Sequence, residues 1–203
     1  TIYIIISLIA YFIGSISFSV IFSRKFAGFD VREKGSGNAG TTNVLRSVGK
    51  KAAAITLVCD ILKGIVAIAI AAFASKIWKE VNVEILKYLA GFFAILGHTF
   101  PIFFEFRGGK GVATALGVLI TLNWKIGLVC LIFGVILIAL TKMVSVGSIL
   151  AAILFPILMI FMGNVRFEAI IISVLIALLV IFNHRSNIKR IQNGTENKLS
   201  FKK

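Results

Sequence analysis

Long apolar stretches alternate with short polar ones along this chain. A helix rises about 1.5 Å per residue, so about 20 apolar residues cross the roughly 30 Å hydrocarbon core of a bilayer. The long stretches cover residues 2–23, 52–75, 85–104, 126–140, 149–162 and 168–182, and a shorter one covers residues 112–122. This pattern predicts an all-α, polytopic integral membrane protein with seven transmembrane helices.

Composition agrees with the pattern. Hydrophobic residues make up 59% of the 203 positions, and the mean hydropathy of +1.01 is too high for an ordinary soluble domain. No linker rich in Pro, Ser or charge divides the chain, and no fixed repeat is visible, so we expect residues 1–203 to form a single transmembrane domain. No basic region precedes the first apolar run, which disfavours a signal peptide.

The distribution of Lys and Arg predicts how the chain is oriented in the membrane. The polar segment 24–51 is basic, and by the positive-inside rule it should face the cytoplasm. Sixteen of the 22 Lys and Arg residues then lie on the cytoplasmic side and five on the outer side, with Lys63 inside a span. We therefore expect the N-terminus outside and the C-terminus in the cytoplasm.

The net charge of +14 points to anionic partners. In a membrane protein these are lipid headgroups and anionic substrates rather than nucleic acid. The eight acidic residues are scattered and there are only two histidines, so we expect no metal site and no metal-dependent phosphotransfer. Both cysteines, Cys59 and Cys130, lie in apolar runs, which argues against a disulfide and against a cysteine metal site.

The stretch GHTFPIFFEFRGGKGVAT, residues 97–114, is the clearest candidate site. Its glycines can take positive φ and bring backbone N–H groups close to an anion, while Lys110 adds a full positive charge. A helix is expected to begin next, and a helix N-terminus also attracts phosphate. The motif is not a P-loop, because Gly111 follows Lys110 where Ser or Thr is required. A glycine-rich turn that only reverses the chain fits equally well.

A second polar stretch, GSGNAGTTNVLR, covers residues 35–46. Its small hydroxyl and amide side chains are suited to hydrogen-bonding phosphate oxygens, and Arg46 could hold a phosphate bidentately. The alternative is a solvated loop in which Thr42 or Asn43 caps the following helix.

A third polar stretch, NHRSNIKRIQNGTE, covers residues 183–196. If it is helical, His184 and Asn187, three positions apart, share one face, where an imidazole and an amide could act together. Anchoring of the basic residues to anionic lipid is the competing interpretation, and it is strongest for Arg185, Lys189 and Arg190.

Asp60 and Lys63 lie within an apolar run and are also three residues apart. Charges inside a membrane are costly unless they are paired, so either a structural ion pair or a pair facing the site is possible. We favour the structural pair.

The expected topology brings the three polar stretches to the cytoplasmic side, and their residues carry a resemblance. The three stretches in this order, with DILKG at residues 60–64 as a lesser match, resemble the motifs of the bacterial glycerol-3-phosphate acyltransferases that use acyl phosphate as donor. Two departures are visible, since Ala39 and Ser17 stand where that family often has proline. Both changes bear on backbone stiffness more than on chemistry.

The resemblance implies a seven-helix fold in the bacterial inner membrane, with an active site facing the cytoplasm. It also implies transfer of a fatty acyl group from acyl phosphate to the sn-1 hydroxyl of glycerol 3-phosphate, which yields lysophosphatidic acid. Acyl phosphate is already activated, so no metal, cofactor or nucleophilic cysteine is needed. The chain also lacks the His-x4-Asp signature of thioester-dependent acyltransferases, because Phe103 and Lys189 stand five residues after the two histidines.

We therefore expect His184 and Asn187 to orient the glycerol hydroxyl and the acyl carbonyl. The base is either His184 or, as we prefer, the phosphate of the donor. Residues expected to bind substrate and phosphate are Ser36, Asn38, Thr42, Asn43, Arg46, Gly108, Gly109, Lys110, Gly111 and Ser148. Residues expected to support the site structurally are His98, Asp60, Lys63 and Glu196.

Two other classes of function remain possible from sequence. A transporter or channel for small organic phosphates would use similar polar groups, although transporters usually hold their site near the midplane within repeated halves. A lipid-binding scaffold would explain the basic C-terminal segment but not the glycine motifs.

Overall fold

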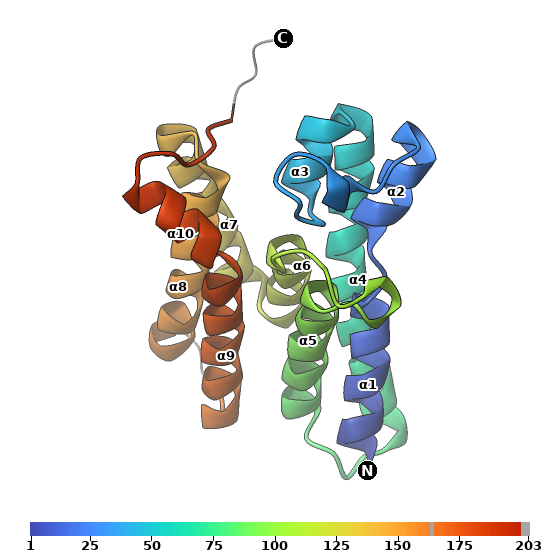
Figure 1. The fold of residues 1–203 in the computed structure, drawn as a ribbon. Helices are drawn as coiled ribbons and strands as arrows, with labels where there is room; N and C mark the ends of the chain where they lie inside the picture. Colours follow the sequence, from blue (N-terminus) through green and yellow to red (C-terminus); the bar gives the residue numbers. More distant parts are fainter. Residues whose placement is uncertain (163–164, 200–203) are drawn as a thin grey trace. The chain divides into compact units, whose positions relative to one another are not determined.

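A computed structural model describes residues 1–162 and 165–199. Within these ranges the secondary structure is entirely helical, with no strand, as the long apolar stretches predicted. The chain divides into two compact units, Thr1–Leu122 and Asn123–Lys203 (Figure 1).

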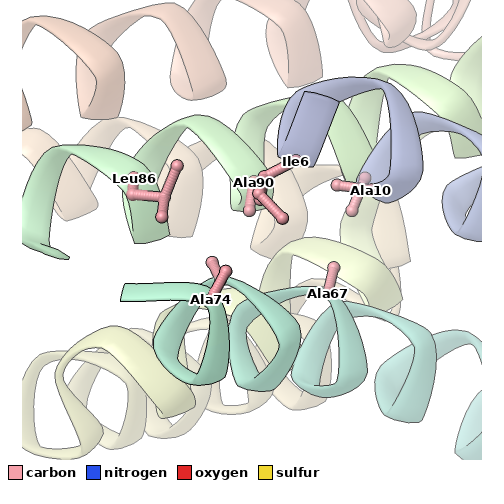
Figure 2. Packing of buried hydrophobic residues seen from close by; sticks show 8 residues of the cluster. Ile6, Ala10, Ala67, Ala74, Leu86 and Ala90 are labelled. Atoms are coloured by element: carbon pink, nitrogen blue, oxygen red, sulfur yellow. The ribbon is translucent and has the colours of Figure 1, made fainter. Parts of the chain in front are cut away.

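The first unit is built around three long helices that contact one another, α1, α4 and α5. Its elements are α1 (Ile2–Gly14), α2 (Phe18–Ala27), η1 (Val31–Glu33), α3 (Thr41–Ser47), α4 (Lys50–Ile77), α5 (Val83–Thr99), η2 (Ile102–Phe104) and α6 (Val112–Leu122). Alanine dominates the contact between the long helices: Figure 2 shows Ala67 and Ala74 on the side of α4 that faces Leu86 and Ala90 of α5 and Ala10 of α1. Small side chains let helix backbones approach closely, which is the usual basis of helix association in membranes.

The second unit contains α7 (Trp124–Thr141), α8 (Val144–Met162), α9 (Phe167–Asn183) and α10 (Arg185–Gln192). A Cβ on Gly147 of α8 would overlap the backbone oxygen of Gly134 of α7, so these two helices also pack through glycine. α9 and α10 meet at a bend of 57°. The bend separates an apolar helix from a short basic one that follows it.

Five helical segments of the described chain are long and apolar enough to cross a membrane, and α9 with α10 would make a sixth. The protein is therefore a multi-pass membrane protein. α6 has only 11 residues, so it is too short to cross the whole hydrocarbon core by itself.

The first apolar run is not one straight helix. α1 ends at Gly14 and α2 begins at Phe18, although the run was expected to be continuous over residues 2–23. A side chain on Gly14 would overlap the backbone of Ala94, so the end of α1 is packed closely against α5. At the break, Lys63 Nζ donates a hydrogen bond of 2.8 Å to the carbonyl oxygen of Ile16. The chain is thus interrupted here without a proline, since Ser17 holds that position.

Candidate functional site

One asparagine shapes the second polar stretch, residues 35–46, and the loop that leads into it. Asn43, only 2% exposed, accepts a hydrogen bond of 3.0 Å from the backbone N–H of Ser36 through Oδ1. Its Nδ2 donates to the carbonyl oxygens of Val31, Lys34 and Asn38 at 2.9 to 3.1 Å. The amide that we predicted to contact phosphate is therefore committed to the loop backbone. The alternative, in which Thr42 or Asn43 caps the following helix, is also wrong, because Gly40 is the N-cap of α3.

Other polar residues of this loop remain at the surface. Ser36 and Arg46 are exposed, whereas Asn38 and Thr42 are half-buried. Thr42 and Arg46 are four residues apart on α3, so their side chains share one face of that helix. A hydroxyl and a guanidinium on the same face are suitable donors for an anion.

Backbone hydrogen bonds tie the glycine-rich loop to the last turn of α5. The N–H of Gly108 donates to Thr99 O and the N–H of Gly109 to His98 O, both at 3.1 Å. We had expected these N–H groups to bind an anion, so that part of the prediction is corrected.

Close packing gives the two glycines a different purpose. A Cβ on Gly108 would lie 2.6 Å from Thr99 O, and one on Gly109 would lie 2.7 Å from Ala39 O. Gly111 has φ of +84°, a backbone conformation that favours glycine. The glycines therefore allow the loop to lie flat against its neighbours, and Lys110, which is half-buried, is placed between them.

The segment before these glycines is strained. Glu105 and Phe106 have φ of 58° and 56°, which is the left-handed region for two consecutive residues that are not glycine. Each such residue costs about 1 to 2 kcal/mol. Backbone bonds hold this turn, since the N–H groups of Phe104 and Phe106 both donate to Pro101 O at 3.0 Å. Strain of this kind persists only where surrounding contacts enforce it.

The first two polar stretches meet within the first unit. Ala39 O lies against Gly109, as the close approach above shows, and Arg32 Nη1 donates a 2.7 Å bond to Phe104 O. The Phe104 side chain packs against a buried cluster formed by Val20, Val31, Ala39, Val44, Ala52 and Ala53. The predicted proximity of these two stretches is therefore present in the structure.

Asp30 and Arg32 form the main ion pair of the loop that precedes residues 35–46. Neither residue was singled out from the sequence. Arg32 Nη2 lies 2.9 Å from Asp30 Oδ2, and Arg24 Nη2 approaches the same oxygen at 2.9 Å. Burial raises the pKa of the Asp30 carboxyl, but hydrogen bonds and charge from Arg32 outweigh this and hold that pKa below its ordinary value. The only sequence signal was one aspartate two residues before an arginine.

Three charged or polar residues expected to be structural form a buried cluster in the first unit. Lys63 Nζ is 2.9 Å from Asp60 Oδ1, as their spacing predicted, and His98 Nδ1 is 3.6 Å from the same oxygen. All three side chains are at most 7% exposed. A Cβ on Gly109 would overlap the His98 ring, so His98 packs directly against the glycine-rich loop.

In the second unit the buried carboxylate of Glu196 accepts hydrogen bonds from the third polar stretch and from α8. Glu196 Oε1 accepts hydrogen bonds from Ser145 Oγ at 2.8 Å and from Asn187 Nδ2 at 2.7 Å. Its Oε2 accepts from Arg190 Nε at 2.9 Å. Burial raises the pKa of the Glu196 carboxyl, but hydrogen bonds from Asn187, Ser145 and Arg190 bring it below its ordinary value. Ser145 was missed from sequence.

His184 lies at the bend between α9 and α10, where it ends one helix and precedes the next. Its Nδ1 is 2.7 Å from Val180 O, and a carbonyl oxygen can only accept, so Nδ1 must carry the proton. In the neutral ring the lone pair is therefore on Nε2. His184 and Asn187 are 3% and 5% exposed, which places both in protected surroundings.

Ser148 belongs to the same unit, in the second turn of α8. It is buried, and its Oγ donates a 2.9 Å hydrogen bond to Val144 O within the helix. Ser145 and Ser148 are three residues apart and therefore share one face of α8. Ser145 donates to Glu196 from this face.

The apolar helices make this an integral membrane protein, and each unit carries polar residues of the kinds that membrane-bound enzymes use. Residues 4–194 match the model of the family described as glycerol-3-phosphate acyltransferase. The chain belongs to this glycerol-3-phosphate acyltransferase family, so it is an acyltransferase rather than a transporter.

Similar proteins agree with this assignment. A glycerol-3-phosphate acyltransferase of Clostridioides difficile (strain 630) is 45% identical and covers 99% of this chain and 97% of its own. One from Thermoanaerobacter sp. (strain X514) is 44% identical, with 97% and 95% covered.

Two solved structures are also similar. A crystal structure of PlsY (YgiH), described as an integral membrane glycerol 3-phosphate acyltransferase in its glycerol 3-phosphate form, has a TM-score of 0.88 and 33% identity, with 98% of this chain and 96% of that chain covered. A second form, with lysophosphatidic acid, has a TM-score of 0.85, 31% identity and the same coverage.

Proposed function

We propose that this protein transfers a fatty acyl group from acyl phosphate to the sn-1 hydroxyl of glycerol 3-phosphate, releasing lysophosphatidic acid and phosphate. This would be the first step of phospholipid synthesis. The observation that carries the proposal is family membership over residues 4–194, together with similarity to a structure in glycerol 3-phosphate and lysophosphatidic acid forms.

Acyl phosphate is proposed as the donor because the chain lacks the sequence signature of thioester-dependent acyltransferases. Cys59 and Cys130 both lie within apolar helices, and neither histidine is followed by the His-x4-Asp pattern. We further propose that no metal and no cofactor take part. In support, the Asp30, Asp60 and Glu196 carboxylates near the polar stretches already form ion pairs with Arg or Lys.

The proposed step is a single acyl transfer. The sn-1 oxygen attacks the acyl carbonyl carbon, a new C–O ester bond forms, and the bond from that carbon to the phosphate oxygen breaks. The hydroxyl proton passes to the departing phosphate, which leaves as hydrogen phosphate. Charge on both substrates is carried by phosphate, so cationic and hydroxyl donors are the main requirement of the protein.

In the first unit we assign phosphate binding to Lys110, Arg46 and Ser36, with Asn38 and Thr42 as further donors. Support comes from the contact between the loops that carry these residues, and from the exposed positions of Ser36 and Arg46. Asn43 is reassigned to shaping the loop, and the glycines at 108, 109 and 111 to letting Lys110 sit close to its neighbours. His98, Asp60 and Lys63 are assigned a supporting role.

In the second unit we assign to His184 and Asn187 the orientation of the glycerol hydroxyl and the acyl carbonyl. Asn187 is fixed by Glu196, and the tautomer of His184 is fixed by Val180 O. Ser148 is assigned to phosphate binding.

We propose the donor phosphate rather than His184 as the base. A general-base histidine is commonly paired with a carboxylate that stabilises the imidazolium. The Nδ1 partner of His184 is instead the neutral carbonyl of Val180. Such a bond orients the ring but provides less stabilisation for a positive charge. The dianionic phosphate is itself a base next to the reacting hydroxyl.

We also propose seven crossings of a bacterial inner membrane, with the N-terminus outside and the site facing the cytoplasm. The excess of Lys and Arg in the segments placed inside supports this orientation. α6 is short, yet a Cβ on Gly64, near the middle of the 28-residue α4, would lie 2.5 Å from Thr114 O in the first turn of α6. A helix that starts near mid-depth needs only about half of the roughly 30 Å core, and the 11 residues of α6 rise about 17 Å.

A direct assay tests the proposed reaction. Purified protein is supplied with glycerol 3-phosphate and either acyl phosphate or acyl-CoA, and the monoacyl product is measured. Product is expected only when acyl phosphate is the donor. Product only when acyl-CoA is the donor would exclude the proposed donor. Phosphate flux into liposomes without product would favour a transporter.

A further inference from the structure

A single guanidinium joins the two polar loops of the first unit. We propose that Arg32, held by Asp30, is a positioning residue that sets the conformation of the loop carrying Lys110. This inference rests on the proposed function of Lys110 as a phosphate ligand. The contacts of Arg32 with Asp30 and Phe104 together form the Arg32 bridge.

The bridge uses both sides of the guanidinium. On one side, Arg32 Nε and Nη2 donate to the two oxygens of Asp30 at 2.9 to 3.2 Å. On the other side, Nη1 donates to Phe104 O at 2.7 Å. The Arg32 side chain is 7% exposed and that of Asp30 is 6% exposed, so solvent weakens these bonds little.

Asp30 is itself fixed, which makes the bridge rigid at its first end. Asp30 Oδ1 accepts a 3.0 Å bond from the backbone N–H of Arg32 and so caps the short helix η1. Arg24 Nη2 adds a bond of 2.9 Å to Oδ2. A planar guanidinium can match a fixed carboxylate and still present a third N–H in a defined direction, which a lysine cannot do.

The second end of the bridge acts where the Lys110 loop is strained. Phe104 O accepts from Arg32 and also from the N–H of Arg107, at 3.1 Å. The two residues between these positions, Glu105 and Phe106, are the left-handed pair. The bridge therefore holds the carbonyl that closes the strained turn, and three residues after that turn ends comes Lys110.

Loss of the bridge should let the strained turn relax and shift the residues that follow. Gly109 packs against Ala39 O and the His98 ring, so a shift of the loop would disturb these contacts and displace the neighbouring Lys110. Movement of about 1 Å in a positioned group is enough to reduce activity by up to about 100-fold. Arg32 would act on catalysis through Lys110, without touching substrate.

The chain supplies a matched control for this idea. Arg24 binds the same Asp30 oxygen at the same 2.9 Å, but its side chain is 60% exposed and it reaches Asp30 rather than Phe104. Arg24→Gln removes one ion pair to Asp30 and leaves the bridge intact. Arg32→Gln removes the bridge, and Arg32→Lys keeps the charge while losing the guanidinium geometry.

Steady-state kinetics of purified full-length variants test the proposal. Lys110→Ala first identifies the substrate whose KM depends on Lys110. Arg32→Gln is expected to raise the same KM roughly 10-fold, whereas Arg24→Gln leaves it unchanged. Arg32→Lys should resemble Arg32→Gln. A lower kcat with both KM values unchanged, or full rescue by Lys, would overturn the proposal, because either result indicates only a structural or a charge effect.

Two further measurements separate this proposal from the proposed reaction. Arg32→Gln and Lys110→Ala should be non-additive in a double-mutant cycle, and additive effects would contradict action through Lys110. Hydrogen exchange of amides 102–107 should be faster in Arg32→Gln than in Arg24→Gln, and equal exchange would also contradict it. Failure of the unmodified protein to transfer acyl groups would instead refute the proposed function, while the exchange result would still test the bridge.

Discussion

Asn187 and Glu196, nine positions apart in the sequence, are joined by a hydrogen bond of 2.7 Å between Nδ2 and Oε1. The same carboxylate also accepts from Ser145 on α8 and from Arg190 on α10. One buried side chain thus holds together three parts of the second unit. It also fixes the orientation of the amide that we assign to the reacting groups.

Glu196→Ala should destabilise the protein. The change leaves the buried Ser145 hydroxyl and Asn187 amide without this acceptor, at a cost of about 1 to 3 kcal/mol each. Thermal unfolding of the purified protein measures the effect. The control is Glu168→Gln, which removes an exposed ion pair to Arg166 and should change the unfolding temperature little. Equal shifts in the two variants would contradict the role given to Glu196.

Acid should destabilise the protein through Asp30 and Glu196. Both carboxyls have a folded-state pKa below the ordinary value, so they bind protons less readily when folded than when unfolded. Their stabilisation is complete above the ordinary pKa of about 4 and is lost as pH falls through the lowered folded-state pKa. Unfolding temperature measured from pH 7 to pH 3 should therefore fall at the acid end.

The variants Asp30→Asn and Glu196→Gln provide the comparison for this pH series. Each removes one titrating carboxyl, so each should be less stable at pH 7 and less sensitive to acid than the unmodified protein. Identical pH profiles for variants and unmodified protein would show that the acid transition has another source.

Asn43→Ala should both unfold the loop of residues 31–38 and reduce activity. The Asn43 amide supports four backbone groups between residues 31 and 38, so its loss leaves several of them unpaired, at about 1 to 3 kcal/mol for each buried group. Activity and unfolding temperature are measured in parallel with Asn193→Ala, an exposed position. A fully stable Asn43→Ala protein would contradict this assignment.

His184→Gln should retain measurable turnover if the donor phosphate is the base. A general base typically contributes about 100- to 10,000-fold, so a loss smaller than about 100-fold favours the phosphate. The expected result is a lower kcat/KM with product still formed. Abolished turnover with intact substrate binding would identify His184 as the base instead.

Much of this structure was accessible from local sequence rules. The apolar runs predicted an all-helical membrane protein, and a spacing of three residues predicted the Asp60–Lys63 pair. The glycines at 108 and 109 were recognised as special, but for another reason. Their N–H groups bond to α5, and what requires glycine is the closeness of neighbouring backbone. Sequence shows that a Cβ is missing but not which atom takes its place.

The contacts that sequence could not reveal join residues far apart in the chain. Arg32 bonds to Phe104, 72 residues later, and Ser145 to Glu196, 51 residues later. The break between α1 and α2 likewise depends on Lys63 and on the packing of Gly14 against Ala94. No local pattern encodes these partners, because they are selected by how the helices pack.

The measurement that tests the central claim most directly is the steady-state kinetics of Lys110→Ala with acyl phosphate and glycerol 3-phosphate. The control is Lys142→Ala, a change of an exposed lysine in the second unit. Loss of one charged hydrogen bond, worth about 1.5 to 3 kcal/mol, should raise the KM of a phosphate substrate by roughly 10- to 100-fold, with an unchanged unfolding temperature. Unchanged kcat and KM values would contradict a phosphate site at the glycine-rich loop.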